Sequence, residues 1–335
     1  MKRPHILATV LTATALACLG GGCGGGGANS LLLYNGQHPQ LTHALVAAFE
    51  KQTGIDVRVR TNDGIVLANQ LLQEGKRSPA DVYFTENSPE LVTLYEHGLL
   101  ASTDSSTLDE SPKRGGSGNW TGITRRISVL AYNPSLVASS ALPASILQLA
   151  QPRWKGKVAI APTDSDFVPL VGAVLATHGK TAAQSWLAGL ERNAHIYQDD
   201  EAVATAVDRG DVATGVINNY YWFRLRLEVG AKNIHSKLYY FPGGDVGGLE
   251  NISGVAVLAA STHRRNAEKF VNFLVSKPAQ EIIAHSDDFE YPIRPEVKPN
   301  AALPPLSALQ LTALEPVELG DDQPAARLIQ ESGLA

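Results

Sequence analysis

Two tyrosines stand side by side in the stretch INNYYW, at Tyr220 and Tyr221. Neighbouring side chains point to opposite faces of a strand and lie about 100° apart around a helix, so adjacent tyrosines do not normally reach one target. They can converge where one element ends and another begins. The preceding residues, ATGVI, are typical of a strand, and Asn219 is expected to cap a following helix. Both phenol groups would then lie in the first helical turn and could reach one point.

Two further polar side chains follow predicted strands. His38 comes after the strand in YNGQHPQ, and Glu86 comes after the strand in YFTENSPE. Ligands of open α/β sheets bind at the carboxyl ends of strands, so these are candidate binding positions. An imidazole, a carboxylate and two phenols together suit a hard metal ion of high charge. Because a free phenol has a pKa near ~10, only such an ion holds two phenolates at neutral pH, and Fe³⁺ fits this set better than Zn²⁺ or Mg²⁺.

Alternating strands and helices must position these side chains. The segment 31–35 predicts a buried strand, 39–52 predicts a helix that begins with Pro39 and ends at Gly54, and 55–60 predicts a half-buried strand. The same alternation continues along most of the chain. It predicts the α/β fold class, with mostly parallel sheets flanked by helices in two lobes.

Two segments are predicted to cross between the lobes. The strand ISVLAYNP is one and the segment GGLENISGVAVLAA, near Gly254, is the other, while the polar segment 101–122 predicts an exposed loop. Two crossings make the first lobe discontinuous. The predicted first lobe contains residues 29–122 and 251–301, and the predicted second lobe contains residues 123–250 and 302–335.

The N-terminal segment 1–23 follows the pattern of an export signal. Two basic residues precede an apolar stretch, and small residues surround a cysteine. The pattern resembles a bacterial lipoprotein signal, with a lipid on Cys23 and residues 24–30 as a flexible, glycine-rich tether. Cys18 is the second candidate for the lipid, and cleavage beyond both cysteines is a third alternative. The protein is therefore expected in the periplasm or, as a lipoprotein, at the outer face of the cytoplasmic membrane.

The remaining chain has the composition of a globular protein. It has 335 residues in all, of which 44% are hydrophobic and 18% are charged, and it has no cysteine after Cys23 with which to form a disulfide. After the signal, no apolar run reaches the ~18 residues that a membrane-spanning helix needs. The net charge changes from −5 to −7 without the signal, because the signal carries two basic and no acidic residues. We therefore expect a monomer that does not bind nucleic acid.

Five motifs, in order, resemble the periplasmic ferric-iron-binding protein family, the substrate-binding components of iron(III) ABC transporters. They are YNGQH, PADVYFTEN, WKGKVAIAPT, VINNYYW and EYPI, and the similarity extends from about Leu31 to Asn300. The resemblance implies a two-lobed periplasmic-binding-protein fold, in which a His and a Glu of one lobe and two tyrosines of the other hold Fe³⁺. The matching positions here are His38, Glu86, Tyr220 and Tyr221. The resemblance also implies a receptor, not an enzyme, that delivers the ion to an ABC permease and its ATPase.

Members of that family often complete the iron coordination with an anion such as phosphate, held by a Ser-Gly-Ala turn, two Asn side chains and an Arg. Here Asn218 matches one Asn, and Arg125 and Arg126 are the candidates for the Arg. The turn departs from the pattern because it reads PTDSDF, and the second Asn position is also acidic. The departing positions are Asp164 and Asp166 in the turn and Asp200 at the second Asn position, and Ser165 of the turn is a further candidate position beside the anion. Since carboxylates repel an anion, we expect Fe³⁺ to bind without phosphate, with water, carbonate or one of these carboxylates in its place.

Two other functions are compatible with the sequence. A receptor of the same fold for a polyamine, thiamine or a phosphonate would stack its ligand on the aromatic side chains and would not need His38 with Glu86. A non-haem iron enzyme usually combines two His with one carboxylate and keeps coordination positions open for substrate or oxygen. Steady turnover of a product would distinguish the enzyme from a receptor.

Overall fold

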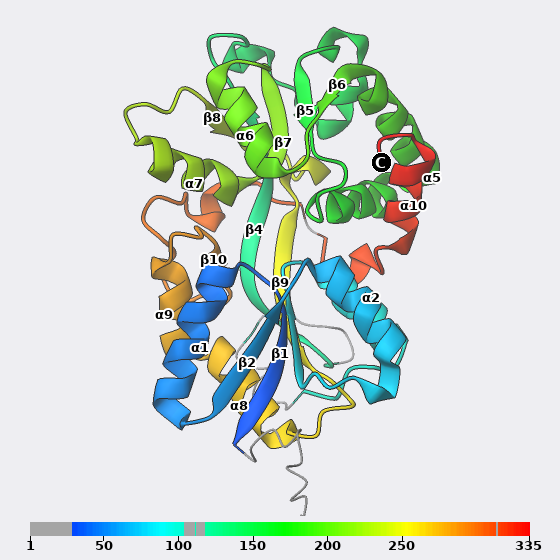
Figure 1. Ribbon diagram of the computed structural model, residues 1–335. Helices are drawn as coiled ribbons and strands as arrows, with labels where there is room; N and C mark the ends of the chain where they lie inside the picture. Colours follow the sequence, from blue (N-terminus) through cyan, green and yellow to red (C-terminus); the bar gives the residue numbers. More distant parts are fainter. Residues whose placement is uncertain (1–28, 104–110, 112–117, 313) are drawn as a thin grey trace, which may run out of the picture.

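The computed structural model describes residues 29–103, 111, 118–312 and 314–335. Two α/β lobes are stacked end to end and are joined by strands that run through the middle of the molecule (Figure 1). The predicted signal with Cys18 and Cys23, and most of the predicted tether and loop, lie outside the described residues. The predicted tether extends to residue 30, whereas Ser30 already begins the first strand, because it pairs with Asp56.

The first lobe is built on a sheet whose outer strands are parallel, in the order β2, β1, β3. Its first elements are β1 (Ser30–Gly36), α1 (Pro39–Thr53), β2 (Asp56–Thr61), α2 (Gly64–Glu74), β3 (Val82–Thr85) and α3 (Ser88–Glu96). Proline stands in the first turn of α1, and Gly54 ends the helix with a φ of 69°, a left-handed value that glycine adopts without strain. The predicted start and end of this helix are confirmed.

Two strands pass between the lobes, and one of them belongs to both sheets. The strands at this junction are β4 (Thr121–Tyr132), β9 (Glu250–Val257), β8 (Lys237–Tyr239) and β10 (Tyr291–Pro292). Along one edge β4 pairs first with β9, as far as Ile127 opposite Glu250, and then with β8. Along the other edge it pairs first with β10 and then, from Ser128 opposite Asn218, with β7. The strand begins earlier than the predicted segment ISVLAYNP, because its polar first half pairs inside the sheet.

The sheet of the second lobe also combines parallel and antiparallel strands. Its strands and helices are β5 (Val158–Ile160), α5 (Phe167–Asn193), β6 (Ala194–Ile196), α6 (Asp200–Arg209), β7 (Thr214–Asn218) and α7 (Asn219–Val229). β5 is parallel to β6 and β7, whereas β4 is antiparallel to its partners. The later helices α8 (Arg264–Val275) and α9 (Lys277–His285) pack on the first lobe, and α10 (Gln323–Glu331) packs on α5.

Alternating strand side chains form a hydrophobic core on each face of both sheets. Leu33 of β1 packs with residues of α1, α8 and α9, whereas its neighbour Tyr34 packs with residues of α2 and α3. In β4, Val129 packs toward α6 and α7, and Leu130 packs toward α5. The predicted two-lobed α/β fold is therefore confirmed. No helix in the described part of the chain is long and apolar enough to cross a membrane.

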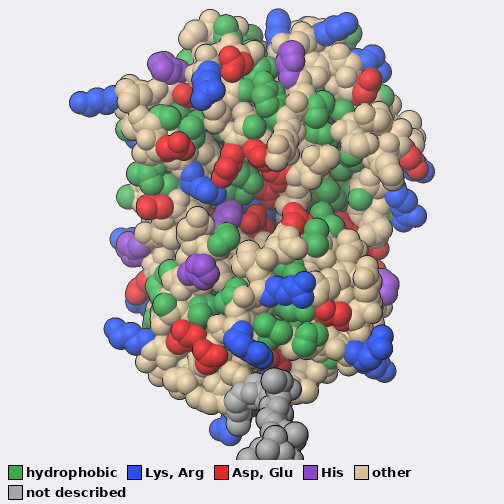
Figure 2. Space-filling view, in the orientation of Figure 1, with side chains coloured by type: hydrophobic (Ala, Val, Ile, Leu, Met, Phe, Trp, Pro, Cys, Tyr) green, Lys and Arg blue, Asp and Glu red, His purple; other side chains and the backbone are tan. Residues whose placement is uncertain are grey.

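Acidic side chains gather where the two lobes meet. The space-filling view shows acidic side chains in a hollow at the level where the two lobes meet, with a histidine beside them (Figure 2). The carboxyl ends of β1, β3 and β7 lead toward this level (Figure 1). The fold thus brings the segments that follow these strands to one place.

Candidate metal site between the lobes

The two tyrosines lie in the first turn of α7, directly after β7. Their ring centroids are 4.0 Å apart, and the ring planes differ by 31°, so both phenols lie on the same side of the turn. The predicted cap is wrong, because Asn218 occupies the N-cap position and Asn219 is the first helical residue. The Asn219 Oδ1 instead accepts a hydrogen bond from the backbone N–H of Ile127 at 2.7 Å. This bond fixes the start of α7 on the crossing strand β4.

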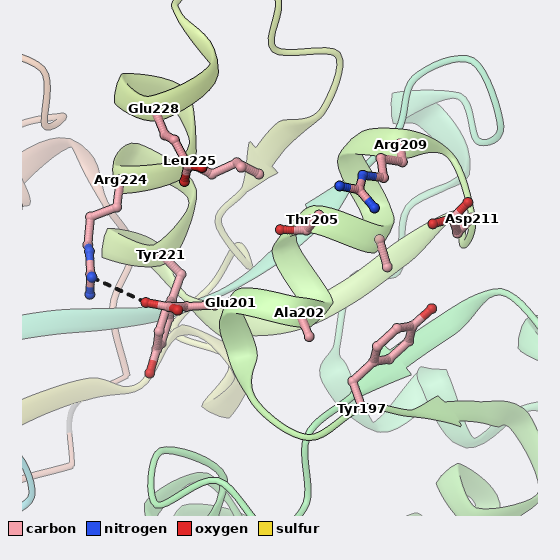
Figure 3. Close-up of a pocket in the computed structure, with 11 residues that line it drawn as sticks. Tyr197, Glu201, Ala202, Thr205, Arg209, Asp211, Tyr221, Arg224, Leu225 and Glu228 are labelled. Atoms are coloured by element: carbon pink, nitrogen blue, oxygen red, sulfur yellow. Dashed lines mark ion pairs between the residues drawn. The ribbon is translucent and has the colours of Figure 1, made fainter.

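The tyrosines differ in their access to solvent. Tyr220 is fully buried, whereas Tyr221 is half-buried and lines a groove of about 480 Å³ between α6 and α7 (Figure 3). On the wall of this groove Arg224 of α7 forms an ion pair with Glu201 of α6, with 3.2 Å between Nη2 and Oε1. Solvent therefore reaches part of the Tyr221 side chain but not the Tyr220 side chain.

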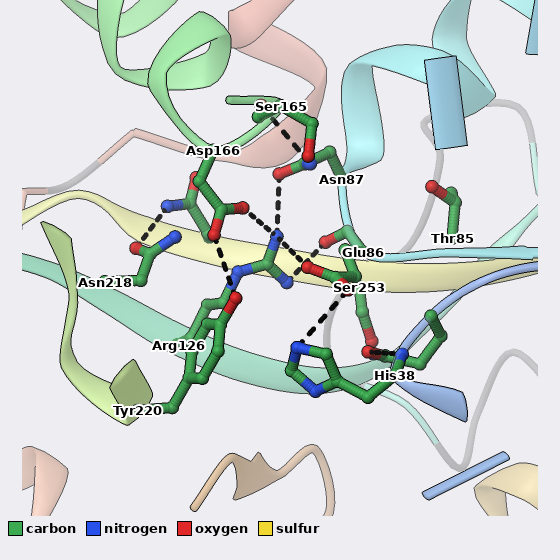
Figure 4. A network of polar contacts seen from close by, with 12 residues as sticks. His38, Thr85, Glu86, Asn87, Arg126, Ser165, Asp166, Asn218, Tyr220 and Ser253 are labelled. Atoms are coloured by element: carbon green, nitrogen blue, oxygen red, sulfur yellow. Dashed lines mark hydrogen bonds and ion pairs between the residues drawn. The ribbon is translucent and has the colours of Figure 1, made fainter. Parts of the chain in front are cut away.

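His38 and Glu86 approach the tyrosines from the first lobe. His38 immediately precedes α1, Glu86 follows β3, and the His38 Nε2 lies 3.3 Å from the Glu86 Oε1 (Figure 4). The imidazole meets the Tyr220 ring edge to face, with 4.7 Å between the ring centroids. All four candidate ligands are thus brought together, two from each lobe.

A buried arginine crosses the same space. Arg126 of β4 donates through Nη1 to the Glu86 carbonyl oxygen at 2.6 Å and through Nη2 to the Asn87 Oδ1 at 2.8 Å and the Asp166 Oδ1 at 2.7 Å (Figure 4). The predicted candidate Arg125 is wrong as a site residue. Its guanidinium contacts Glu250 at 3.3 Å and the carbonyl oxygen of Ile293 at 2.7 Å, because consecutive residues of a strand face opposite sides of the sheet.

The three aspartates that depart from the family pattern, Asp164, Asp166 and Asp200, make different contacts. Asp166 is buried, and its second carboxylate oxygen accepts a hydrogen bond from the Tyr220 hydroxyl at 3.1 Å. Asp164 accepts from the backbone N–H groups of Asp166 and Asp200, at 3.0 and 3.1 Å. Asp200 in turn accepts from the backbone N–H of Asn218 at 3.3 Å. Only Asp166 therefore presents its carboxylate to the arginine and to a candidate ligand.

The other two residues predicted beside an anion lie at the edge of this cluster. The Asn218 Oδ1 accepts from Asn251 at 3.0 Å and from Ser128 at 3.3 Å, while its buried Nδ2 has no hydrogen-bond partner among the described residues. Ser165 contributes only its carbonyl oxygen, which accepts from the Asn87 side chain at 3.5 Å. An unused donor on Asn218 is available to an oxygen atom of a bound group.

Burial sets the protonation of the candidate ligands when no ion is bound. It raises the pKa of both Tyr220 and Tyr221 well above the ordinary value. Burial also raises the pKa of Glu86 to about 8, although the guanidinium of Arg126 opposes this change. The pKa of His38 is lowered, again mainly by burial. Before an ion binds, the two phenols and the Glu86 carboxyl therefore keep protons, which an incoming cation must displace.

Two carboxylates near His38 were not predicted from the sequence. The His38 Nδ1 lies 3.4 Å from the Asp288 Oδ1 and 3.4 Å from the Glu290 Oε1. Glu290 belongs to the motif EYPI, which supports the family resemblance but gave no indication of this contact. The described residues contain no group of three or more His, Cys, Asp or Glu that could hold a metal ion. The candidate site depends on the phenol oxygens of Tyr220 and Tyr221 in addition to His38 and Glu86.

Comparisons with known proteins identify the family of the chain. Residues 78–310 match the family model described as bacterial extracellular solute-binding protein. The chain is 38% identical over 306 residues to the Fe(3+)-binding periplasmic protein of Serratia marcescens, with 91% of this chain and 90% of that protein covered. It is 34% identical to the major ferric iron-binding protein of Neisseria meningitidis serogroup B, with coverage of 91% and 93%. The structure of iron-bound HitA from Pseudomonas aeruginosa superimposes with a TM-score of 0.86 at 40% identity, covering 91% of this chain and 99% of HitA.

These similarities extend over nearly the whole described chain and are not confined to the motifs. They confirm the family resemblance and the two-lobed fold predicted from the sequence. The chain belongs to the family of bacterial extracellular solute-binding proteins.

Proposed function

We propose that this protein captures ferric iron between its two lobes and delivers it to an ABC permease. The observation that carries this proposal is the meeting of His38 and Glu86, from one lobe, with Tyr220 and Tyr221, from the other. The relatives that match over nearly the whole chain are named as ferric-iron-binding proteins. This favours an iron receptor over the receptor for another solute and over the non-haem iron enzyme.

The four side chains suit a trivalent ion because most of the donors become anionic oxygens. Two phenolates and one carboxylate neutralise the charge of Fe³⁺, and the His38 Nε2 supplies a neutral nitrogen. Burial holds the phenols in their protonated form, so an ion must have a high charge density to displace these protons. Divalent ions provide less of this driving force.

Asp166 is the best candidate for the position that an anion occupies in many relatives. One of its oxygens pairs with Arg126 at 2.7 Å and the other accepts from Tyr220 at 3.1 Å, so the carboxylate already lies between the cation and a ligand. The Arg126 guanidinium holds the pKa of this carboxyl below its ordinary value, although burial opposes this effect. A permanent carboxylate at this position makes an external phosphate or carbonate unnecessary.

Because the four candidate ligands are divided between the two lobes, iron binding is linked to closure of the lobes on each other. Each lobe alone offers two of the four ligands, so Fe³⁺ stabilises the closed arrangement by the difference in affinity between closed and open forms. A permease can then recognise the loaded protein by its closed shape. The receptor would be held near the permease by a lipid on Cys23, at the outer face of the cytoplasmic membrane, and would act as a monomer.

Titration of the iron-free protein, residues 24–335, with a ferric chelate tests the proposal. Binding through phenolates produces a visible charge-transfer band, and elemental analysis should find one iron per chain. A protein that stays colourless and contains no iron after the titration would refute the proposed function.

A further inference from the structure

Glu290 is a buried carboxylate, and one of its oxygens accepts no hydrogen bond from the described residues. Its side chain has 0% exposure, and its Oε1 lies 3.4 Å from the His38 Nδ1. Neither atom has a hydrogen-bond partner in the described part of the chain. Buried polar atoms are normally paired, so two such atoms that face each other require a shared proton. A proton on Nδ1 satisfies both atoms.

The other carboxylate oxygen is held directly by the crossing strand β4 and, through it, by β9. Thr124 of β4 donates to the Glu290 Oε2, and the Thr124 hydroxyl lies 2.6 Å from the hydroxyl of Ser253 of β9. The Gln37 Nε2 also donates to the same oxygen at 3.4 Å, and the Gln37 Oε1 accepts from the backbone N–H of His38 at 2.7 Å. Glu290 is therefore fixed both to the sheet and to the segment that carries His38.

The backbone beside Glu290 has an unusual conformation. Phe289 has a φ of 51°, and it is the only non-glycine residue in the described ranges with a positive φ. Aromatic residues rarely adopt this conformation unless the surrounding structure enforces it, and such residues cluster at functional sites. The Phe289 ring is held by stacking on Phe223 of α7, with 5.5 Å between centroids. The turn places Asp288 and Glu290 on the same side, toward His38.

We infer that Glu290 is a positioning residue that keeps the proton of His38 on Nδ1 and leaves the lone pair of Nε2 directed at Glu86 and the metal position. This inference rests on the proposed function, because it assigns His38 Nε2 as an iron ligand. Ligating histidines generally donate their other N–H to a carboxylate or carbonyl, which fixes the tautomer and the ring orientation. Glu290 fits this role better than Asp288, whose side chain keeps 9% exposure, whereas Glu290 has none.

The substitution Glu290→Gln should reverse the tautomer with little change in shape. Thr124 and Gln37 both donate to the Oε2 position, so the amide oxygen of glutamine should take that position. The amide NH₂ would then face the His38 Nδ1 and donate to it. The imidazole proton would move to Nε2, where it blocks the lone pair needed for the metal.

Nitrogen-15 NMR of histidine-labelled, iron-free protein tests the inference directly, with His38→Ala to assign the resonance. The residues that hold Glu290 and His38 lie within strands β4 and β9 or directly beside β1 and β10 of the first-lobe sheet, so the measurement does not need a closed, loaded site. We expect the wild-type proton on Nδ1 and the Glu290→Gln proton on Nε2. We also expect Glu290→Gln to retain iron against citrate at least about tenfold less well.

Asp288→Asn is the matched control, because it removes a carboxylate at the same 3.4 Å distance from His38. It should leave the tautomer unchanged and iron retention within about twofold of wild type. A wild-type proton on Nε2, an unchanged tautomer in Glu290→Gln, or equal losses in both variants would each overturn the inference. A wild-type protein with the expected tautomer that binds no iron would instead refute the proposed function and leave the assignment of Glu290 to the tautomer intact.

Discussion

The Tyr220 hydroxyl lies 3.1 Å from the Asp166 Oδ2, while the other oxygen of the same carboxylate pairs with a buried arginine. The carboxylate is therefore part of the site before any ion enters. The family resemblance implies a neutral Ser-Gly-Ala turn beside an external anion, whereas the turn of this chain carries Asp166. This difference gives the first prediction.

Asp166→Asn should convert an anion-independent iron site into one that needs phosphate. The amide is neutral, so Arg126 is left without its closest negative partner and can hold an added anion instead. We expect phosphate to change iron retention by less than about twofold in the wild type and by roughly tenfold or more in the variant. Competition with citrate, with and without phosphate, measures both. Asp164→Asn is the control, because Asp164 accepts only backbone N–H groups; a strong phosphate requirement in the wild type would contradict the role of Asp166.

Tyr220→Phe and Tyr221→Phe should each weaken iron retention more than His38→Ala. Each tyrosine substitution removes an anionic ligand, whereas the histidine substitution removes a neutral one. Loss of one member of a buried charge pair costs about 3 kcal/mol, or roughly 100-fold in affinity. Both tyrosine variants should also lose intensity in the visible band. Equal losses in retention for all three variants would show that the phenolates do not dominate binding.

Iron retention should fall as the pH falls from 8 to 5. Binding requires the deprotonated form of Glu86, whose pKa is raised by burial to about 8, and of two phenols whose pKa values are also raised. Protons therefore compete with the ion throughout this range. Citrate competition at several pH values measures the effect, and retention that is independent of pH would exclude these groups as ligands.

The iron-free protein should show the opposite trend in folding stability. Burial raises the pKa of Glu90 from an ordinary 4.5 to about 8, so the native state keeps a proton that the unfolded chain releases above about pH 4.5. The native state then binds more protons, and the free energy of unfolding decreases as the pH rises from 5 to 8. Thermal melting at each pH should show this decrease.

Glu90→Gln tests the origin of that trend. Glutamine remains neutral and can still accept from the Tyr83 hydroxyl, which lies 2.6 Å from the Glu90 carboxylate, so the variant should have a flatter pH dependence. Glu96→Gln, at an exposed position of the same helix, should leave the slope unchanged. The prediction fails if both variants retain the wild-type slope.

Mass spectrometry of the N-terminal peptide from membranes should find a lipid on Cys23. The reason is the export signal with a cysteine at its end and glycines behind it. Cys23→Ser should release the protein from the membrane fraction. A lipid on Cys18, or an unmodified N-terminus beyond residue 23, would show that the cleavage position was misassigned.

The strands and helices that carry the candidate ligands could be predicted because their signals are local. Pro39 and Gly54 mark the ends of α1, and the two tyrosines follow a short apolar strand. Local signals could not decide between Arg125 and Arg126, because the choice depends on which face of β4 looks into the site. That face is set by pairing with β9 and β10, which lie far away in the sequence.

The contacts of Glu290 could not be predicted for a related reason. Its approach to His38 depends on the short strand β10, on the positive φ of Phe289 and on the side chain of Thr124. None of these has a local pattern in the sequence. The role of Asp166 could be predicted in part, because the sequence identifies three candidate aspartates. Only the geometry separates Asp166, which pairs with Arg126, from Asp164 and Asp200, which accept from backbone N–H groups.

The pairing of β3 with β9 has a consequence for the order in which the protein folds during synthesis. Val82 lies opposite Val257, so the first-lobe sheet cannot be completed until the chain has been made beyond that residue. The strands β5, β6 and β7 lie within one continuous segment between β4 and β9 and can pair earlier. Closure over so long a separation is slow. The strand β3 therefore stays without its partner β9 through most of translation, which suits a chain that carries a predicted signal for threading across a membrane.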